Sequence, residues 1–302
     1  MDTLHQILEG LMTRYQQRVS DVGKILSALK KKGIINDVSA IENDHIAFRT
    51  IGVPQLGIQS LEKIFLHHGY TAKDDFYFEH KKINARWYAP PQEYLPRIFI
   101  SELRVNDFPE SIQQIIRSFT DEVKVDPVDH LDLNNAAQVD EFLHSPLWRI
   151  PKWSEYTTLA EVSEYASWVI YNKYYLNHFT ISVHNLPAAY STLEAFNDFL
   201  VSIGISLNSA GGYIKTSQDG LLRQSSSVSK MIDATFAEGV VHQISGSYVE
   251  FAERKVLEEF AHLASSQIER KHRRDGFETA NADKIFESTY LSQTNTNKKG
   301  KD

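Results

Sequence analysis

The chain has 302 residues, of which 42% are hydrophobic and 24% charged, so it can bury a large core in one domain or in two fused modules. Its net charge of −7 argues against nucleic-acid binding, because contacts to phosphate need a concentrated excess of Lys and Arg. The absence of cysteine excludes disulfides, thiolate metal sites and iron–sulfur clusters, so a metal site would have to use His, Asp or Glu.

The N-terminal segment has a helical pattern. Apolar residues recur at helical spacing from Leu4 to Leu29 and stop before Gly33, which predicts one or two amphipathic helices over residues 3–33. Acidic residues interrupt this pattern, and the segment lacks the apolar stretch of a signal peptide. We therefore expect no secretory signal, no membrane span and, by default, a cytoplasmic protein.

Residues 44–105 are predicted to form a first β-α-β-β module. A strand-like run begins at His45, a helical pattern over 58–69 ends in glycine, and two strand-like stretches follow at 74–91 and 97–105. The next segment, 107–176, is richer in helical patterns and turn residues. We expect it to be a helical insertion between two modules.

The β-α-β-β order recurs over residues 177–290. The predicted elements are a strand at 177–185, a helix at 186–204, a hairpin-like pair at 211–228 and a strand at 242–254. Two such modules could pair so that their concave sheets enclose a pocket within a single domain over residues 1–291.

Two predictions concern the end of the chain. Residues 256–271 have a helical pattern, and the basic run 269–274 is expected on a solvated helix face or at a helix C-terminus. Residues 292–302 are polar and lack apolar anchors, so a disordered tail is expected.

Three predicted strands each carry a side chain that could bind a metal: His45, His178 and Glu250. Two imidazoles and one carboxylate from separate strands form the facial triad typical of non-haem Fe(II) oxygenases, which leaves one face of the metal open. Alternation along the first strand places Arg49 on the same face as His45, where it could bind a substrate carboxylate. A buried Glu250 would need a partner, and a divalent cation would supply one.

Each of these residues also has a simpler interpretation. A single strand histidine is more often a surface or hydrogen-bonded core residue, and a single arginine more often forms a surface ion pair. A competing group of metal-binding residue types lies in a polar stretch that is more often a solvated turn: His68, Asp74, Asp75 and His80. Three polar residues of the second half could line the same pocket: Lys215, Gln224 and Ser226.

Seven stretches, in order over about residues 44–290, resemble the 2-oxoadipate dioxygenase/decarboxylase family: DHIAFRT, KKINARWYAPP, IFISEL, NHFTISV, GGYIKTSQDGLLRQSSS, YVEFAER and ADKIFEST. The resemblance implies an α+β, vicinal-oxygen-chelate-like fold, in which paired β-α-β-β modules form a curved sheet around a central metal site, with additional helices. It also implies that Fe(II) is held by His45, His178 and Glu250.

The same resemblance implies an activity. The substrate would be a small 2-oxo diacid, with Arg49 on its distal carboxylate and the backbone at Ala280 and Asn281 in contact with it. The implied reaction converts 2-oxoadipate and O2 into 2-hydroxyglutarate and CO2 in lysine degradation. Two alternatives stay open: a non-redox isomerase or lyase of the same fold that uses Zn or Mn on a 2-oxo acid, and a non-catalytic protein that senses a 2-oxo acid.

Overall fold

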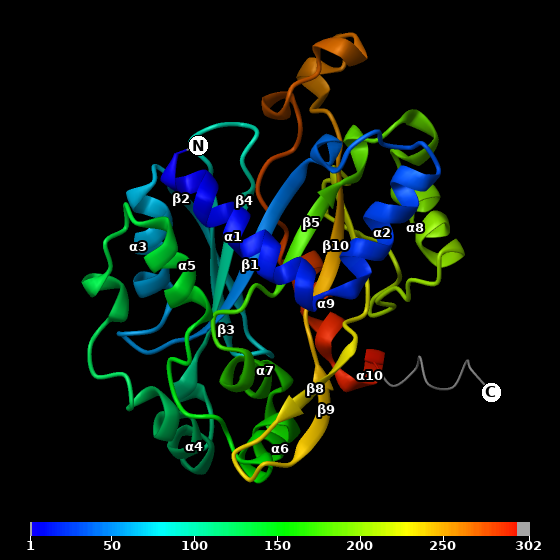
Figure 1. The fold of residues 1–302 in the computed structure, drawn as a ribbon. Helices are drawn as coiled ribbons and strands as arrows, with labels where there is room; N and C mark the ends of the chain where they lie inside the picture. Colours follow the sequence, from blue (N-terminus) through cyan, green and yellow to red (C-terminus); the bar gives the residue numbers. More distant parts are fainter. Residues whose placement is uncertain (1, 295–302) are drawn as a thin grey trace, which may run out of the picture.

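The computed structural model describes residues 2–294, and its strands form one large curved sheet and a separate hairpin (Figure 1). The strands are β1 (Asn43–Ile51), β2 (Thr71–Phe78), β3 (Ile83–Ala89), β4 (Arg97–Leu103), β5 (His178–Ser182), β6 (Lys215–Thr216), β7 (Leu222–Ser226), β8 (Met231–Thr235), β9 (Val241–Ser245) and β10 (Tyr248–Arg254). The helices are α1 (Thr3–Arg18), α2 (Ser20–Lys31), α3 (Ile58–His67), α4 (Glu110–Thr120), α5 (Ala136–His144), α6 (Trp153–Val162), α7 (Glu164–Asn172), α8 (Leu193–Ser202), α9 (Thr279–Ile285) and α10 (Leu291–Thr294).

The large sheet joins two modules edge to edge. Its strand order is β2-β3-β4-β1-β5-β10-β7-β6, so the strand that begins each module, β1 or β5, lies at the centre. These two strands run antiparallel, with Ala47 opposite His178. Each is flanked on its other side by a parallel partner, β4 or β10. This arrangement agrees with the predicted pair of modules around a curved sheet.

The first module contains one strand more than predicted. The stretch 74–91 lies in two antiparallel strands, β2 and β3, which are joined by a tight turn where Lys82 has a φ of 55°. In the second module the hairpin-like pair is β6 and β7, as predicted. When only the strands of the large sheet are counted, both modules therefore have the order β-α-β-β-β.

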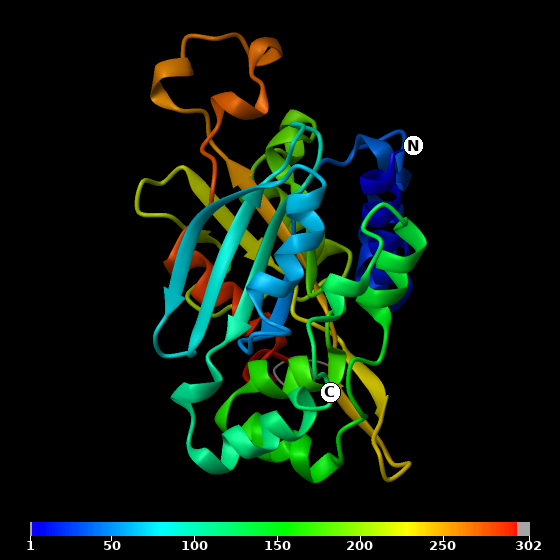
Figure 2. The same cartoon turned by 90° about the vertical axis from the view of Figure 1, so that its left-hand side faces the viewer.

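Helices cover both faces of the sheet. Figures 1 and 2 show α1 and α2 crossing one face, while α9 lies against the other. The apolar stripe of α1 is buried, and α2 ends at Lys31, two residues before Gly33, whose φ of 68° favours glycine. The hydroxyl of Tyr15 in α1 donates to the backbone carbonyl of Tyr248, so this helix supports the strand that carries Glu250.

The insertion between the modules is helical, as predicted. It contains α4 to α7, and the connection between α5 and α6 is anchored by Trp148, which is buried and donates to the carbonyl of Ile170. The β8-β9 hairpin packs against α6 and α7 through an aromatic cluster that includes Trp153 and Phe236. Strand β8 was not predicted, and the strand predicted over 242–254 is divided at Gly246 into β9 and β10.

The helix predicted over residues 256–271 is wrong. These residues form an arm of three short 3-10 turns that projects from the molecule (orange in Figure 1). The arm is largely exposed, so its apolar positions have no core to pack against, and a helical pattern without such packing is marginal. The basic run 269–274 therefore lies on no α-helix, although Arg270–His272 form one of the 3-10 turns, and its arginines bind backbone carbonyls and Asp219.

Two further observations concern the termini and the membrane. Residues 292–294 belong to α10, so that part of the predicted disordered tail is wrong, while 295–302 lie outside the described residues. Among the helices of residues 2–294, none has the length and apolar character needed to cross a bilayer.

Candidate metal centre

The three predicted metal ligands meet at the centre of the sheet. His45 comes from β1, His178 from β5 and Glu250 from β10, and all three side chains are buried. The two imidazole Nε2 atoms are 3.3 Å apart, and the Glu250 carboxylate oxygens lie 3.1 Å from His178 Nε2 and 3.5 Å from His45 Nε2. Ligand atoms at right angles and about 2.1 Å from one ion are about 3.0 Å apart, so this spacing fits a bound metal. Their role as ligands stays a prediction.

Each histidine is oriented by the residue directly before it. His45 Nδ1 lies 2.8 Å from Asp44 Oδ1, and His178 Nδ1 lies 3.0 Å from Asn177 Oδ1. When Nδ1 carries the hydrogen and donates to these oxygens, the lone pair of Nε2 points to the centre, as metal binding requires. Asp44 and Asn177 were not predicted as site residues, although the sequence has an acidic or amide residue directly before each histidine.

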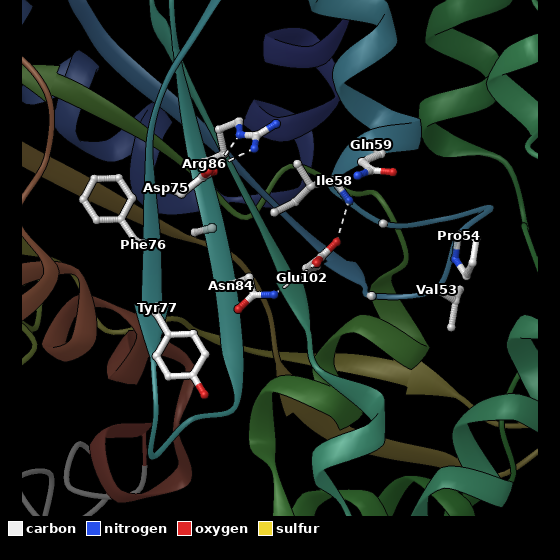
Figure 3. Close-up of a pocket in the computed structure, with 13 residues that line it drawn as sticks. Val53, Pro54, Ile58, Gln59, Asp75, Phe76, Tyr77, Asn84, Arg86 and Glu102 are labelled. Atoms are coloured by element: carbon white, nitrogen blue, oxygen red, sulfur yellow. Dashed lines mark hydrogen bonds and ion pairs between the residues drawn. The ribbon is translucent and has the colours of Figure 1, made fainter.

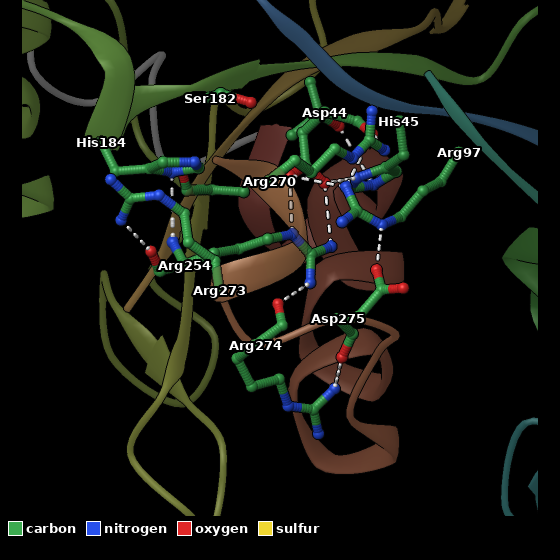
Figure 4. Close-up of polar contacts among 12 residues, drawn as sticks. Asp44, His45, Arg97, Ser182, His184, Arg254, Arg270, Arg273, Arg274 and Asp275 are labelled. Carbon is green, nitrogen blue, oxygen red and sulfur yellow. Dashed lines mark hydrogen bonds and ion pairs between the residues drawn. The ribbon is translucent and has the colours of Figure 1, made fainter. Parts of the chain in front are cut away.

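Asp44 is the centre of a buried charge network (Figure 4). Arg254 donates to both carboxylate oxygens, at 2.6 and 2.9 Å, and Arg97 lies 3.3 Å away. Burial opposes the charge of Asp44, but Arg254 and Arg97 outweigh it and hold the pKa of this carboxyl well below its usual value. Asp44 is therefore an anion that accepts from three side chains, while Asn177 offers a neutral amide oxygen.

The two histidines differ in their tendency to hold a proton. Burial lowers the pKa of His178 well below its usual value, and the positive charges of His45 and Arg49 act in the same direction. Burial also opposes a charge on His45, but the carboxylates of Glu250 and Asp44 outweigh it and raise the pKa of His45. His178 is thus already neutral, whereas a cation would have to compete with a proton at His45.

A chain of two amides leads to the third candidate ligand. Gln224 Nε2 donates to Glu250 Oε1 at 2.6 Å, and Asn281 Nδ2 donates to Gln224 Oε1 at 3.0 Å. The hydrogen bond fixes one carboxylate oxygen and leaves the other free for the centre. Of the residues expected to line the pocket, Gln224 does so.

The other candidate lining residues lie elsewhere. The Lys215 ammonium donates to the carbonyl of Asn208, and the Ser226 hydroxyl is bonded to that of Ser288. Ala280 is exposed at the start of α9 and does not line the cavity. Its predicted backbone contact to substrate, like that of the buried Asn281, stays a prediction.

Arg49 shares the central cavity with the triad. Its guanidinium is buried and donates to Thr289 Oγ1 at 3.0 Å and to the carbonyl of Phe286 at 3.1 Å. Two aromatic rings, those of Tyr165 and Trp168, have their centres 5.1 Å from its Cζ. No acidic side chain of the described residues forms an ion pair with it, so a buried positive charge faces the cavity without an anion.

The cavity is closely packed. Its free volume is about 20 Å³, about the space of one water molecule. Phe99, Phe277 and Phe286 contribute its apolar wall, and the ring of Phe277 meets that of His45 edge-on at 4.8 Å. A larger ligand would enter only if lining side chains moved apart.

The competing cluster at 68–80 does not form. Asp75 pairs with Arg86, Asp74 accepts from Trp87 Nε1, and His68 contacts the carbonyl of Leu133. Within residues 2–294, His45, His178 and Glu250 are the one group of three potential ligands close enough to share an ion.

A larger hollow of about 550 Å³ lies beside the start of α3, over β2 to β4 (Figure 3). Its charged side chains already have partners in the protein. Glu102 accepts from the backbone N–H of Ile58 at 2.8 Å, and Arg86 pairs with Asp75 at 2.6 Å. The hollow therefore lacks the unpaired charge and the ligand group that the smaller central cavity has.

Comparison with known proteins points to one family. The model of the 2-oxoadipate dioxygenase/decarboxylase family matches residues 7–267. A protein of Arabidopsis thaliana with that name, described as chloroplastic, is 45% identical over 83% of this chain and 68% of its own length. A relative from Oryza sativa subsp. japonica, described as chloroplastic/amyloplastic, is 42% identical over 83% of this chain and 70% of its own length.

Solved structures agree with this match. The hydroxyglutarate synthase of Oryza sativa, crystallised in complex with 2-oxoadipate, has a TM-score of 0.87 and 38% identity, covering 95% of this chain and 92% of that one. A putative glyoxalase superfamily protein from Ralstonia eutropha has a TM-score of 0.65 at 18% identity, over 90% of this chain and 84% of that one. The predicted vicinal-oxygen-chelate-like fold is confirmed.

The expected cytoplasmic location is wrong. Both plant relatives are named as plastid proteins, which contradicts the expectation. The absence of recognisable targeting patterns was a weak basis for that expectation, because a location in the cytoplasm was assigned only by default.

Proposed function

The chain belongs to the 2-oxoadipate dioxygenase/decarboxylase family, and from this premise we propose that it uses Fe(II) to convert 2-oxoadipate and O2 into 2-hydroxyglutarate and CO2. The observation that carries the proposal is the shared cavity: a buried group of two histidines and one glutamate faces the same small space as Arg49, a buried cation without an anion. A metal would bind the two histidines and the glutamate at one end of this space, and a carboxylate would pair with Arg49 at the other.

The donor set suits Fe(II). Two imidazoles and one carboxylate on one side of an ion leave the opposite positions open for a chelating 2-oxo acid and O2. When bound, Fe(II) would supply the activation of O2 that amino-acid side chains do not provide. The chain's own contribution is to orient the ligands, which Asp44, Asn177 and Gln224 do through their hydrogen bonds.

Arg49 is the proposed anchor for the distal carboxylate. Its planar guanidinium can donate two parallel hydrogen bonds to a carboxylate, and burial among aromatic rings strengthens the attraction. Fixing the far end of the substrate would orient its 2-oxo acid end toward the triad, which lowers the entropic part of the barrier. The aromatic wall of the cavity would exclude water from the reacting atoms.

Oxygen uptake tests the proposal. Protein loaded anaerobically with Fe(II) is mixed with 2-oxoadipate, O2 consumption is recorded, and the products are identified by mass spectrometry. We expect one 2-hydroxyglutarate and one CO2 for each O2 consumed. The same protein loaded with Zn(II), and the Fe(II)-treated His178→Ala variant, should consume none.

The same experiment distinguishes the proposed reaction from the non-redox alternative, which must be considered because Zn or Mn could also bind this donor set. Turnover of the 2-oxo acid by Zn(II)- or Mn(II)-loaded protein without O2 consumption would support an isomerase or lyase. Iron binding without turnover would contradict the proposed reaction on this substrate.

A further inference from the structure

Tyr248 lines the central cavity, and its buried hydroxyl has no hydrogen-bond partner of ordinary geometry. Tyr248 is only 1% exposed, and buried hydroxyls in native proteins almost always have a hydrogen-bond partner. A phenol is protonated at neutral pH, so this group offers a hydrogen to whatever enters the cavity. An orphaned donor in a candidate binding site indicates a ligand that accepts.

A second orphaned donor lies close by. Arg49 Nε has no hydrogen-bond partner, although its two terminal nitrogens are bonded to Thr289 and Phe286. The Tyr248 hydroxyl lies near Arg49 and Ser288, and weak polar contacts with both side chains act on it together with the charge of Arg49. Neither contact has the geometry of an ordinary hydrogen bond. The Tyr248 hydroxyl and Arg49 Nε can both donate, and Nε cannot accept, so they do not satisfy each other fully.

The ring of Tyr248 is held in place. It lies against the ring of His178, with centres 4.7 Å apart and an angle of 32° between the planes. Strand pairing also sets Tyr248 beside His178, and the hydroxyl of Tyr15 binds its backbone carbonyl from the opposite face. The orphaned hydroxyl is therefore presented by a fixed side chain, and its lack of a partner does not come from a flexible one.

We propose that Tyr248 is a substrate-binding residue that donates a hydrogen bond to the distal carboxylate of a 2-oxo diacid, together with Arg49. The inference rests on the proposed function for the identity of the substrate. A carboxylate has acceptor sites for both donors at once, which a methyl terminus lacks. Tyr248 would thus add selectivity for a diacid over a monoacid of the same length.

The test compares Tyr248→Phe with wild type on 2-oxoadipate and on 2-oxohexanoate, which has a methyl group in place of the distal carboxylate. We expect kcat/KM for 2-oxoadipate to fall by about 10- to 100-fold, mainly through KM, since a hydrogen bond to a charged group is lost. For 2-oxohexanoate the change should stay within about 3-fold. Equal losses on both substrates, or a loss confined to kcat, would overturn the inference.

A binding measurement makes the inference independent of turnover. Adipate, a dicarboxylate that needs no reaction, is titrated into wild type and Tyr248→Phe by calorimetry, with hexanoate for comparison. We expect only adipate binding to weaken in the variant, by a similar factor. If wild type binds adipate but shows no O2 uptake with 2-oxoadipate, the proposed function fails and the role of Tyr248 stands; unchanged adipate binding in the variant rejects the role of Tyr248 alone.

Tyr174→Phe is the matched control. Tyr174 is also buried, but its hydroxyl donates to the carbonyl of Leu56, away from the cavity. We expect Tyr174→Phe to lower the melting temperature and leave substrate selectivity unchanged, whereas Tyr248→Phe should melt no lower than wild type. A marked loss of stability in Tyr248→Phe would show that its hydroxyl has a structural partner and would contradict the inference.

Discussion

Asp44 and Arg254 form a two-pronged ion pair in the interior, beside the ring of His45. The other side of the Arg254 guanidinium donates to the carbonyl of Gly276 at 2.7 Å, directly before Phe277. The ring of Phe277 in turn packs against His45. One ion pair therefore holds both a candidate metal ligand and the aromatic residue that covers it.

Asp44→Asn should weaken metal binding by about 10- to 100-fold, the usual effect of changing a group that orients a ligating histidine. The amide can still accept from His45, but it leaves Arg254 and Arg97 without their anion. Metal affinity is measured by titration with Co(II) against a chelator. Asp275→Asn is the control, because Asp275 pairs with Arg97 without touching His45. Equal affinities for wild type and Asp44→Asn would rule out the orienting role.

The alternation of side chains along strands was sufficient to predict that His45 and Arg49 share a face. The convergence of His45, His178 and Glu250 could not be derived in this way, because it depends on the pairing of β1 with β5 and of β5 with β10. Sequence separations of more than 70 residues contain no information about that pairing. The family resemblance supplied the connection that periodicity could not.

The helix predicted over residues 256–271 was wrong although the local sequence pattern was clear. Its helical spacing was real, but a short amphipathic pattern forms a helix only when a neighbouring surface covers its apolar side. The arm instead contacts the rest of the protein through side chains that bind backbone carbonyls, among them Arg270, which donates to the carbonyl of Leu95. Contacts of this kind involve no periodic signal, and the role of Arg254 beside Asp44 was missed for the same reason.

Glu250→Gln should remove the stabilisation that metal gives to the folded state. Wild type is expected to gain about 2.7 kcal/mol when the free metal is at 100 times its Kd, whereas the variant should gain little. Without metal, the variant should unfold at or above the wild-type temperature, because a neutral amide is cheaper to bury than a carboxylate. Thermal denaturation with and without Fe(II) or Co(II) measures both effects.

Glu253→Gln is the control for that experiment. Glu253 is a buried carboxylate on the same strand, but it pairs with Arg223 and lies away from the triad. The Glu253→Gln variant should be stabilised by metal as much as wild type. If metal stabilised Glu250→Gln as strongly as wild type, Glu250 would not be a metal ligand.

Arg49→Met should impair use of the diacid and spare the metal. Methionine fills much of the same space among the aromatic rings but cannot bind a carboxylate. We expect kcat/KM for 2-oxoadipate to fall by about 100-fold or more, since two charge-assisted hydrogen bonds are lost. Arg18→Met, which removes a mostly buried arginine bonded to Asn172 in another region, is the control. A parallel loss of metal affinity in Arg49→Met would mean that the variant damages the whole centre.

His184 is expected to make the folded state sensitive to acid. It is a partly buried member of the polar cluster in Figure 4, and its Nδ1 accepts from the backbone N–H of Arg254 at 3.2 Å. Burial, followed by the charge of Arg273, lowers the pKa of His184 from 6.5 to about 3. Above pH 6.5 the ring is neutral in both states and has no effect; below it, the unfolded chain takes up a proton that the folded protein does not.

His184→Asn should therefore reduce the loss of stability in acid. Well below pH 6.5 the histidine costs the folded state about 1.4 kcal/mol for each pH unit, until its folded pKa is reached. The variant should therefore gain about 2.3 kcal/mol on wild type between pH 6.5 and 4.5, because half of the unfolded chains are already protonated at pH 6.5. Urea denaturation at pH 7.5, 6.5, 5.5 and 4.5 measures the difference, and exposed His80→Asn serves as the control. If the stabilities of wild type and His184→Asn fell in parallel over this range, His184 would have to accept a proton in the folded state, and its burial would not be the source of acid sensitivity.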